Sequence, residues 1–417
     1  MLYERWRQIV RENRNELALH DIAIGERWTF VQLDTASERG KLITGPIAFP
    51  QSISAEFVLT VLRAWRAGQF VCPLEEGQAP PSFAQLPKGC IHLKTTSATS
   101  GPSRAIAFTG KQLAADAENI VATMSLRRDW PNLGVISLAH SYGFSNLVLP
   151  LLLHGIPLIV ANSPLPEVMR QAATVARCLT LAAVPALWRA WHDANAIPEN
   201  IRLAISAGAP LSLSLEQAVF DATGVKLHNF YGSSECGGIA YDSTNVPRTN
   251  ATCVGAPVRN VELSVNADDC LEIRSQAVGQ TYWPETSPNL SDGCYRTSDL
   301  AELKDGLVFL RGRASDLINI AGRKVSPEII ERVLLTHPDV KECLVLGVPS
   351  NEAERSETIV AVVAGGQSLT GDSLKQLLLT RLPAWQVPRE WCFVDSLEIN
   401  QRGKLSRAEW RRKLLER

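Results

Sequence analysis

Hydrophobic positions in the middle third of the chain alternate between short apolar runs and stretches with helical spacing. The runs expected to be strands are Val135–Ala139, Ile156–Ala161, Thr180–Val184, Ile201–Ser206 and Lys226–Tyr231. The stretches expected to be helices are Asn146–Leu153, Pro166–Arg177, Pro185–Asp193 and Ser212–Ala222. This alternation predicts a parallel sheet covered on both faces. Because sites in such sheets lie at the carboxyl ends of the strands, the loops after Ala139, Ser206 and Tyr231 are expected to share one crevice.

The pattern changes twice beyond this region. From about residue 250 the apolar runs become short and are separated by Asp-Asp or Asp-Gly turns, which predicts a small antiparallel, barrel-like unit. After Arg313, helices are expected at Pro327–Leu335 and Gly371–Arg381, with strands near Glu342–Gly347 and Thr358–Val363. We therefore predict an α/β protein. Its N-terminal domain is expected at 1–312, with a core at about 90–245 and a barrel-like part at about 250–312, and a mobile α+β lid domain is expected at 313–417.

Composition excludes several classes of protein. Apolar residues make up 45% of the 417 residues and charged residues 20%, and the formal net charge is -1. No global field favours nucleic acid or an anionic membrane, so neither is expected as a partner. Leu2, Trp6, Ile9 and Val10 predict an amphipathic N-terminal helix rather than a signal peptide. No apolar stretch approaches the roughly 20 residues that a membrane span needs, so a cytoplasmic protein is expected.

The nine cysteines include no C-x-x-C pair, which disfavours zinc ligation and favours free thiols. Cys236 has no histidine or basic residue near it in sequence, so a small buried filler is preferred to a nucleophile.

Two motifs carry small hydroxyl residues and glycine, which suit phosphate binding. The loop from Thr96 to Arg104 reads TSATSGPSR and ends in a cation. It does not match the Walker P-loop, which disfavours that class of NTPase. The second motif, Tyr231–Glu235, reads YGSSE at the end of a predicted buried strand. Its carboxylate suits Mg²⁺. Alone, each motif is equally compatible with an ordinary loop or turn.

Three further segments complete the set. Asp299 ends the segment YRTSD and could accept both hydroxyls of a ribose or simply cap a turn. The segment from Gly312 to Glu328 lies where the pattern of apolar and polar residues changes, so it is expected to be a domain junction with backbone freedom at its glycines. Lys404 follows Gly403 near the C-terminus, a pairing that means nothing by itself.

In this order and spacing, the five segments resemble the adenylate-forming superfamily of acyl- and aryl-CoA synthetases, adenylation domains and luciferases. The resemblance runs from about Glu26 to Arg407, and it is to a short, bacterial-type AMP-binding enzyme. It implies ATP and Mg²⁺ as cofactors, with coenzyme A or the phosphopantetheine of an acyl carrier protein as acyl acceptor. It also implies a C-terminal domain that rotates between two half-reactions.

The resemblance assigns site residues by position. The implied catalytic residues are Lys404, Glu235 and Arg104, with Glu235 also the Mg²⁺ ligand. The implied nucleotide-binding residues are Thr96, Ser97, Thr99, Ser100, Gly101, Gly208, Ala209, Pro210, Tyr231, Gly232, Ser233, Ser234, Asp299 and Arg313. The implied acid pocket is His140, Tyr142, Phe144, Ser145, Ala207 and Gly237, and the implied hinge and thiol-tunnel residues are Ser315 and Gly322.

The chain departs from the family pattern at a few positions. Ala98, Ser103 and Arg104 stand where the loop usually has Gly, Pro and Lys, and Arg104 presents a planar fork rather than a point charge. Ser315 stands at the hinge in place of Asp or Lys, and Glu398 replaces a proline before the lysine turn.

The acid-pocket segment lacks the aspartate that would pair with an amino acid's ammonium. Amino acids are therefore disfavoured. The mostly apolar pocket with a few polar groups fits an aryl acid such as a hydroxybenzoate, which is favoured, or a medium-chain fatty acid. Two further functions fit the same motifs: a nucleotide-binding relative without turnover, and an enzyme whose acceptor is an amine or dioxygen.

Overall fold

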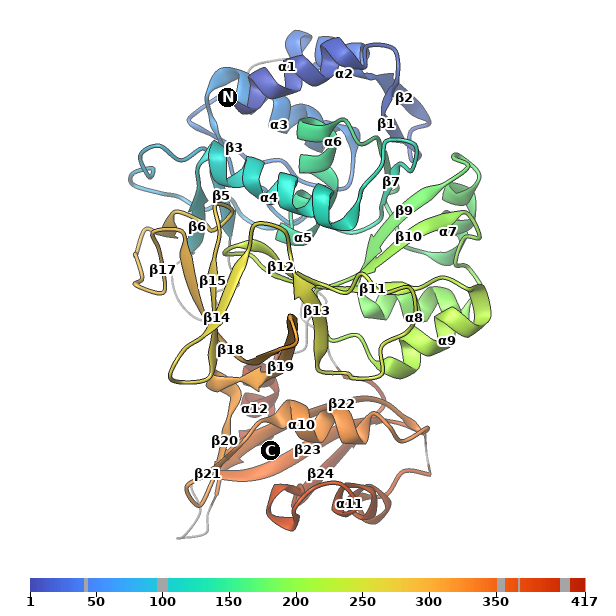
Figure 1. Ribbon diagram of the computed structural model, residues 1–417, viewed down its shortest axis with the longest axis vertical. Helices are drawn as coiled ribbons and strands as arrows, with labels where there is room; N and C mark the ends of the chain where they lie inside the picture. The colour runs from blue at the N-terminus through green and yellow to red at the C-terminus, as the bar shows by residue number, and fades with distance from the viewer. Residues whose placement is uncertain (41–43, 96–103, 351–356, 367, 398–405, 417) are drawn as a thin grey trace.

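The computed structural model describes residues 1–40, 44–95, 104–350, 357–366, 368–397 and 406–416. It forms a large N-terminal α/β body and a smaller C-terminal domain, which lies at the bottom of Figure 1. Among the described residues, no helix combines the length and the hydropathy needed to cross a bilayer.

The predicted parallel sheet is confirmed. Its strands are β1 (Leu17–Asp21), β7 (Asn132–Gly134), β8 (Leu158–Val160), β9 (Leu179–Ala183), β10 (Ile201–Ser206) and β11 (Leu227–Ser233). They lie side by side in the order β11-β10-β9-β7-β8-β1, and every pair is parallel. β2 (Glu26–Thr29) adds an antiparallel edge to β1.

One strand was predicted in the wrong place. β7 ends at Gly134, whereas the sequence pattern placed a strand at Val135–Ala139. The hydroxyl of Ser137 accepts hydrogen bonds from the backbone N–H groups of Ala139 and His140. This local bonding replaces strand pairing and turns the chain toward the next helix.

Helices cover the body in accordance with the apolar periodicity. They are α1 (Leu2–Glu12), α2 (Phe30–Arg39), α3 (Ala55–Ala67), α4 (Gly110–Met124), α5 (Ser141–Gly143), the π-helix η1 (Phe144–Val148), α6 (Leu149–His154), α7 (Pro166–Ala173), α8 (Pro185–Asp193) and α9 (Leu213–Thr223). Local signals set their starts: Thr109 forms a capping box with Gln112 at α4, and Pro185 occupies the first turn of α8.

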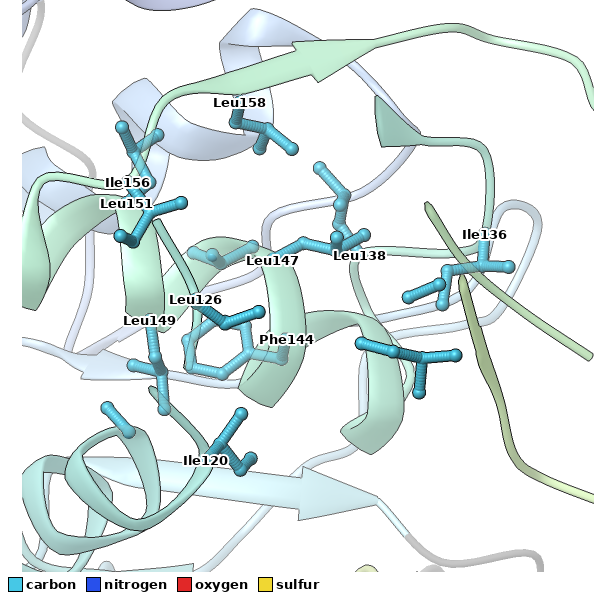
Figure 2. Packing of buried hydrophobic residues seen from close by; sticks show 14 of the residues in the cluster. Ile120, Leu126, Ile136, Leu138, Phe144, Leu147, Leu149, Leu151, Ile156 and Leu158 are labelled. Carbon is cyan, nitrogen blue, oxygen red and sulfur yellow. The ribbon is translucent and has the colours of Figure 1, made fainter. Parts of the chain in front are cut away.

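The core of the body lies around η1 and α6. Figure 2 shows Phe144, Leu147, Leu149 and Leu151 of these helices packed against Ile120 and Leu126 and against strand residues such as Leu158. Phe144 and Leu147 are each 1% exposed. The apolar run that is too short to span a membrane is therefore a buried helix and strand.

A second sheet carries the ends of the phosphate-loop motif. Its strands are β3 (Ile47–Ala48), β4 (Phe70–Val71), β5 (His92–Thr95), β6 (Ala105–Phe108) and β16 (Thr281–Trp283). β16 pairs with β6 although about 175 residues separate them, which places Trp283 opposite Ala105. The sequence pattern did not predict this pairing.

The antiparallel unit beyond residue 250 is also present. It contains β12 (Gly237–Tyr241), β13 (Cys253–Pro257), β14 (Glu262–Val265), β15 (Cys270–Arg274), β17 (Leu290–Ser291), β18 (Cys294–Lys304) and β19 (Leu307–Arg313). In the described chain these strands follow the open order β14-β15-β18-β19-β13-β12 and continue the large sheet instead of closing on themselves. The expected turns are confirmed, because Asp269, Asp292 and Asp305 all have positive φ angles.

The C-terminal domain alternates helices and strands. Its elements are the 3₁₀ turn η2 (Ala314–Asp316), β20 (Ile318–Ile320), β21 (Arg323–Val325), α10 (Pro327–Leu334), β22 (Val340–Pro349), β23 (Glu357–Gly365), α11 (Gly371–Leu379), the 3₁₀ turn η3 (Ala384–Gln386), β24 (Glu390–Val394) and α12 (Arg407–Leu415). Alternate residues of β22 and β23 face opposite sides of the sheet, as the strand period requires. Val345 and Ala361 pack with α10 and α11, while Leu344 and Val362 pack with Trp410 of α12.

Candidate active site

Asp299 lies at the centre of one group of predicted site residues. The register of β18 and β19 places it opposite Arg313, whose Nε donates to Asp299 Oδ1 at 2.8 Å. From β11, the hydroxyl of Tyr231 donates to Asp299 Oδ2. Burial raises the pKa of Tyr231 well above its usual value, and the nearby Asp299 carboxylate raises it further. Tyr231 therefore stays a neutral donor that orients the carboxylate at neutral pH.

Glu235 lies at the centre of a second group. Its backbone N–H bonds to Ser233 Oγ at 3.2 Å, and its carbonyl accepts from Gly279 N at 2.7 Å. Tyr282 of β16 donates its hydroxyl to Glu235 Oε1 at 3.1 Å. These bonds hold the carboxylate at the end of β11.

Tyr282 joins this carboxylate to the end of the phosphate-loop motif. The guanidinium of Arg104 lies over the Tyr282 ring, 3.7 Å from its centroid, within the range of a strong cation–π contact. Burial, followed by the charge of Glu235, raises the pKa of Tyr282. Sequence analysis missed Tyr282, because only the pairing of β16 with β6 brings it here and its local sequence carries no signal.

The first group holds one carboxylate between Tyr231 and Arg313, and the second holds a cation and a carboxylate around Tyr282. Tyr295, four residues before Asp299 on β18, influences the pKa of Tyr282. Such an arrangement can bind a molecule that carries anionic groups and hydroxyls, since Arg104 attracts anions and Asp299 accepts hydrogen bonds.

The donor set fits Mg²⁺ as a cation shared with a phosphate ligand. Among the described residues, no group of three or more His, Cys, Asp or Glu side chains is placed to hold a metal. Glu235 alone supplies one carboxylate at this position, and Mg²⁺ in phosphate sites commonly takes one or two protein carboxylates and completes its shell with phosphate oxygens and water.

The predicted acid-pocket residues divide between a rim and the interior. At the rim, His140 Nδ1 accepts from the backbone N–H of Tyr142 at 3.3 Å, and the Tyr142 hydroxyl donates to Ile205 O at 3.4 Å. Tyr142 also lies against Phe230, with ring centroids 6.1 Å apart. These contacts bring the segment after β7 against β10 and β11 near their carboxyl ends, the region where sites in a parallel sheet lie.

The other acid-pocket residues lie deeper. Phe144 packs against His92 and Phe57 in the core, and Ser145 is 2% exposed with its hydroxyl bonded to Asp116. Gly237 is buried beside the same aspartate. Phe144, Ser145, Ala207 and Gly237 are thus buried and belong to the interior rather than to the open rim.

The remaining nucleotide-binding positions are exposed around these groups. Gly208, at φ 84°, together with Ala209 and Pro210, forms an exposed turn after β10, while Ala207 is buried at its base. Gly232 is exposed and Ser234 half-buried in the turn before Glu235.

The junction to the C-terminal domain is narrow. Gly312 has a φ of 123°, and a Cβ there would overlap Ser326 Oγ, so only glycine fits this crossing. Ser315 follows in η2, where its hydroxyl donates to Asp316 at 3.1 Å. Gly322 lies exposed in the β20–β21 turn with open space around it.

Several predicted positions lie outside the described residues. These are Thr96, Ser97, Ala98, Thr99, Ser100, Gly101, Ser103, Glu398 and Lys404. Cys236 is fully buried, and burial raises the pKa of its thiol, which agrees with a filler rather than a nucleophile.

Comparisons with known proteins identify the family. The model of the AMP-binding enzyme family matches residues 74–283, and that of the AMP-binding enzyme C-terminal domain matches residues 329–404. The chain therefore belongs to the AMP-binding enzyme family, as the motif resemblance predicted.

Among curated relatives, a mitochondrial malonate–CoA ligase of Mus musculus is 28% identical over 370 residues. The match covers 75% of this chain and 63% of that protein, so the chain spans less than two thirds of the relative's length. A feruloyl-CoA synthase of Amycolatopsis is 26% identical over 345 residues, covering 78% of this chain and 70% of that protein.

Solved structures share the whole fold. ATP-bound MatB from Rhodopseudomonas palustris superposes with a TM-score of 0.87 at 21% identity, covering 99% of this chain and 98% of that one. An o-succinylbenzoate CoA synthetase from Bacillus subtilis, solved with its acyl-adenylate intermediate, gives a TM-score of 0.84 at 19% identity, covering 97% of each chain. At these identities the likeness establishes the adenylate-forming fold.

Proposed function

We propose that this protein is an ATP-dependent acid–thiol ligase. It joins a carboxylic acid to AMP and then transfers the acyl group to the phosphopantetheine thiol of coenzyme A or of an acyl carrier protein. The observation that carries the proposal is the Tyr282 ring, which holds Arg104 on its face and Glu235 at its hydroxyl. A cation and a carboxylate are thereby fixed on one aromatic ring, and Asp299 and Arg313 form a separate ion pair.

The chemistry requires this arrangement because both reactants are anions. An oxygen of the acid attacks the α-phosphorus of ATP, the bond to the β-phosphate oxygen breaks, and pyrophosphate leaves. Arg104 and Lys404 reduce the repulsion between carboxylate and phosphates, and Glu235 would hold a Mg²⁺ that would supply further positive charge. Asp299, oriented by Tyr231 and Arg313, accepts hydrogen bonds from the ribose.

The thiol then attacks the carbonyl carbon of the adenylate. A carbon–sulfur bond forms, AMP leaves with the electron pair of the broken C–O bond, and the thiol proton passes to solvent. Rotation of residues 313–417 about Ser315 would move Lys404 away from the site and bring the Gly322 turn toward it. The narrow junction at Gly312 and the open space around Gly322 support this movement.

Malonate–CoA, feruloyl-CoA and fatty acid–acyl-carrier-protein ligases all occur among the relatives, so relatives alone do not choose the acid or the acceptor. The aromatic pair Tyr142 and Phe230 supports an aryl acid such as a hydroxybenzoate over a medium-chain fatty acid, because aromatic rings pack favourably against one another.

The test separates the two half-reactions. Lys404→Ala is expected to lower acid-dependent ATP–pyrophosphate exchange about 100-fold or more, because it removes a cation from the crowded transition state. Thioester formation from preformed acyl-adenylate should persist. Lys341→Ala, an exposed lysine of the same domain, is the control and should change neither rate.

Equal loss of both half-reactions in Lys404→Ala would contradict the assignment of that lysine. Exchange with no acid in a panel of aryl, fatty, dicarboxylic and amino acids would leave a nucleotide-binding protein without turnover. Exchange without thioester from either coenzyme A or carrier protein would indicate a non-thiol acceptor.

A further inference from the structure

Lys94 is a buried cation that the proposed chemistry does not use. It lies on β5, two residues before the phosphate-loop motif, and is 5% exposed. Leu93 faces the opposite side of the strand, into a small apolar cluster, whereas Lys94 faces the body of the protein. An ammonium group in such a place costs several kcal/mol of desolvation unless it is well paired.

Its pairing within the described residues is poor. The Nζ atom makes one hydrogen bond, a long one of 3.5 Å to Ser145 Oγ, and lies 4.4 Å from the centroid of the Phe108 ring. An ammonium has three N–H donors. Ser145 in turn donates to Asp116 Oδ2 at 2.6 Å, so the nearest carboxylate is reached only through a hydroxyl.

His92 shares the same face of β5 and is fully buried. Neither ring nitrogen has a hydrogen-bond partner among the described residues, although the ring packs 4.5 Å from that of Phe144. Burial, followed by the charge of Lys94, lowers the pKa of His92 well below its usual value, so the ring is neutral with one donor and one acceptor to satisfy.

This cluster, defined as His92, Lys94, Asp116 and Ser145, includes or contacts two positions assigned to the acid pocket. Ser145 is itself an acid-pocket position. Gly237, another, approaches Asp116 so closely that a Cβ would overlap its Oδ1, and Gly238 N donates to the same oxygen at 3.3 Å. The polar atoms of the cluster therefore adjoin two positions assigned to the acid pocket, Ser145 and Gly237.

We propose that Lys94 selects the acid, and that the substrate carries a hydrogen-bond-accepting oxygen at the end remote from its reacting carboxylate. This inference rests on the proposed function. A phenolic oxygen and a second carboxylate share the required chemistry, since each can accept from the Lys94 ammonium. An acid with an apolar end leaves that ammonium facing hydrocarbon and is rejected.

The experiment measures ATP–pyrophosphate exchange with matched pairs of acids. 4-Hydroxybenzoate is compared with 4-methylbenzoate, and adipate with hexanoate, so that the two arms separate a phenolic oxygen from a carboxylate. For at least one pair, kcat/KM of the wild type should favour the polar acid about 10- to 100-fold, the range for a lost hydrogen bond to a charged group.

The double variant Lys94→Met/Asp116→Asn should reduce that ratio to about one or reverse it, because it removes the cation together with its counter-charge. If the double variant does not fold, Lys94→Gln takes its place, with a ratio reduced less. Lys111→Met, an exposed lysine on the neighbouring α4, should keep the wild-type ratio.

Two results would overturn the inference alone: a wild type that prefers the apolar member of both pairs, and a variant that lowers kcat/KM equally for both members. Absence of exchange with all four acids and with the wider panel would overturn the proposed function and this inference together.

Discussion

Two buried clusters of charge in the N-terminal body differ in how completely they are paired. In the first, Lys226 Nζ lies 2.5 Å from Glu216 Oε1, 2.7 Å from Asp242 Oδ2 and 2.7 Å from the carbonyl of Leu227. Arg248 bonds the other oxygen of Glu216 at 2.8 Å. All four charged side chains are at most 6% exposed, and their formal charges cancel.

The second cluster is the one around Lys94. It also buries a lysine and an aspartate, but a serine hydroxyl separates them and the lysine has one long hydrogen bond. The first cluster connects the 242–252 loop to α9. Its charged groups pair with one another, as a structural role requires. The second leaves Lys94 with one long hydrogen bond among the described residues, to Ser145, a position that the motif resemblance assigns to the acid pocket. Incomplete pairing beside a site therefore indicates ligand recognition, whereas complete pairing indicates structure.

The largest expected effect on stability is in the first cluster, the one formed by Lys226, Glu216, Asp242 and Arg248. Glu216→Ala leaves Lys226 and Arg248 buried without their shared carboxylate, which should lower the free energy of unfolding by about 3–5 kcal/mol. Urea unfolding followed by circular dichroism measures the change. Glu199→Ala, an exposed control, should stay within about 0.5 kcal/mol of the wild type. A loss below about 1 kcal/mol for Glu216→Ala would show that the first cluster does not stabilise the fold.

A smaller effect on stability is expected at Gly237, which lies against Asp116 of the Lys94 cluster. Gly237→Ala places a Cβ against Asp116 at a residue whose φ is 70°, so overlap and backbone strain should cost about 1–3 kcal/mol. In an Asp116→Ala background the overlap disappears and only the strain remains. A double-mutant cycle that gave simple additivity would argue against the close approach of these two residues.

The smallest effect on stability is expected from Lys94→Met/Asp116→Asn. Because the pair is poorly connected, its replacement should change the free energy of unfolding by about 1 kcal/mol or less. The same variant is expected to lose acid selectivity, so stability and specificity separate at this cluster. A stability loss as large as that of Glu216→Ala would make the two clusters equivalent and remove the contrast.

Local patterns predicted the framework well where each element is decided by its own residues. Pro185–Asp193 and Ile201–Ser206 were predicted to the residue, because a proline starts the helix and a continuous apolar run forms the buried strand. The prediction at Val135–Ala139 was wrong because a side-chain hydroxyl, Ser137, competes with strand pairing.

The residues of the candidate site divide in the same way: local motifs predicted some of them, and only contacts between distant strands identify the others. Motif order pointed to Arg104, Tyr231, Glu235, Asp299 and Arg313; in the structure Tyr231 and Arg313 contact Asp299, while Arg104 and Glu235 both contact Tyr282. Tyr282 and Lys94 were missed. The charged and imidazole groups in the otherwise apolar run around Lys94 were the one available signal, since a buried strand seldom carries them.

By itself, the sequence determined the α/β class, the family and the residues proposed to handle the nucleotide, because turn chemistry, apolar period and motif spacing are local properties. Only the tertiary structure decided which side chains meet across the sheets: that β16 pairs with β6 and brings Tyr282 to Glu235, and that Lys94 is buried with one long hydrogen bond among the described residues. The physical reason is that pairing between distant strands, and the desolvation of a charge, depend on neighbours that no local stretch of sequence contains.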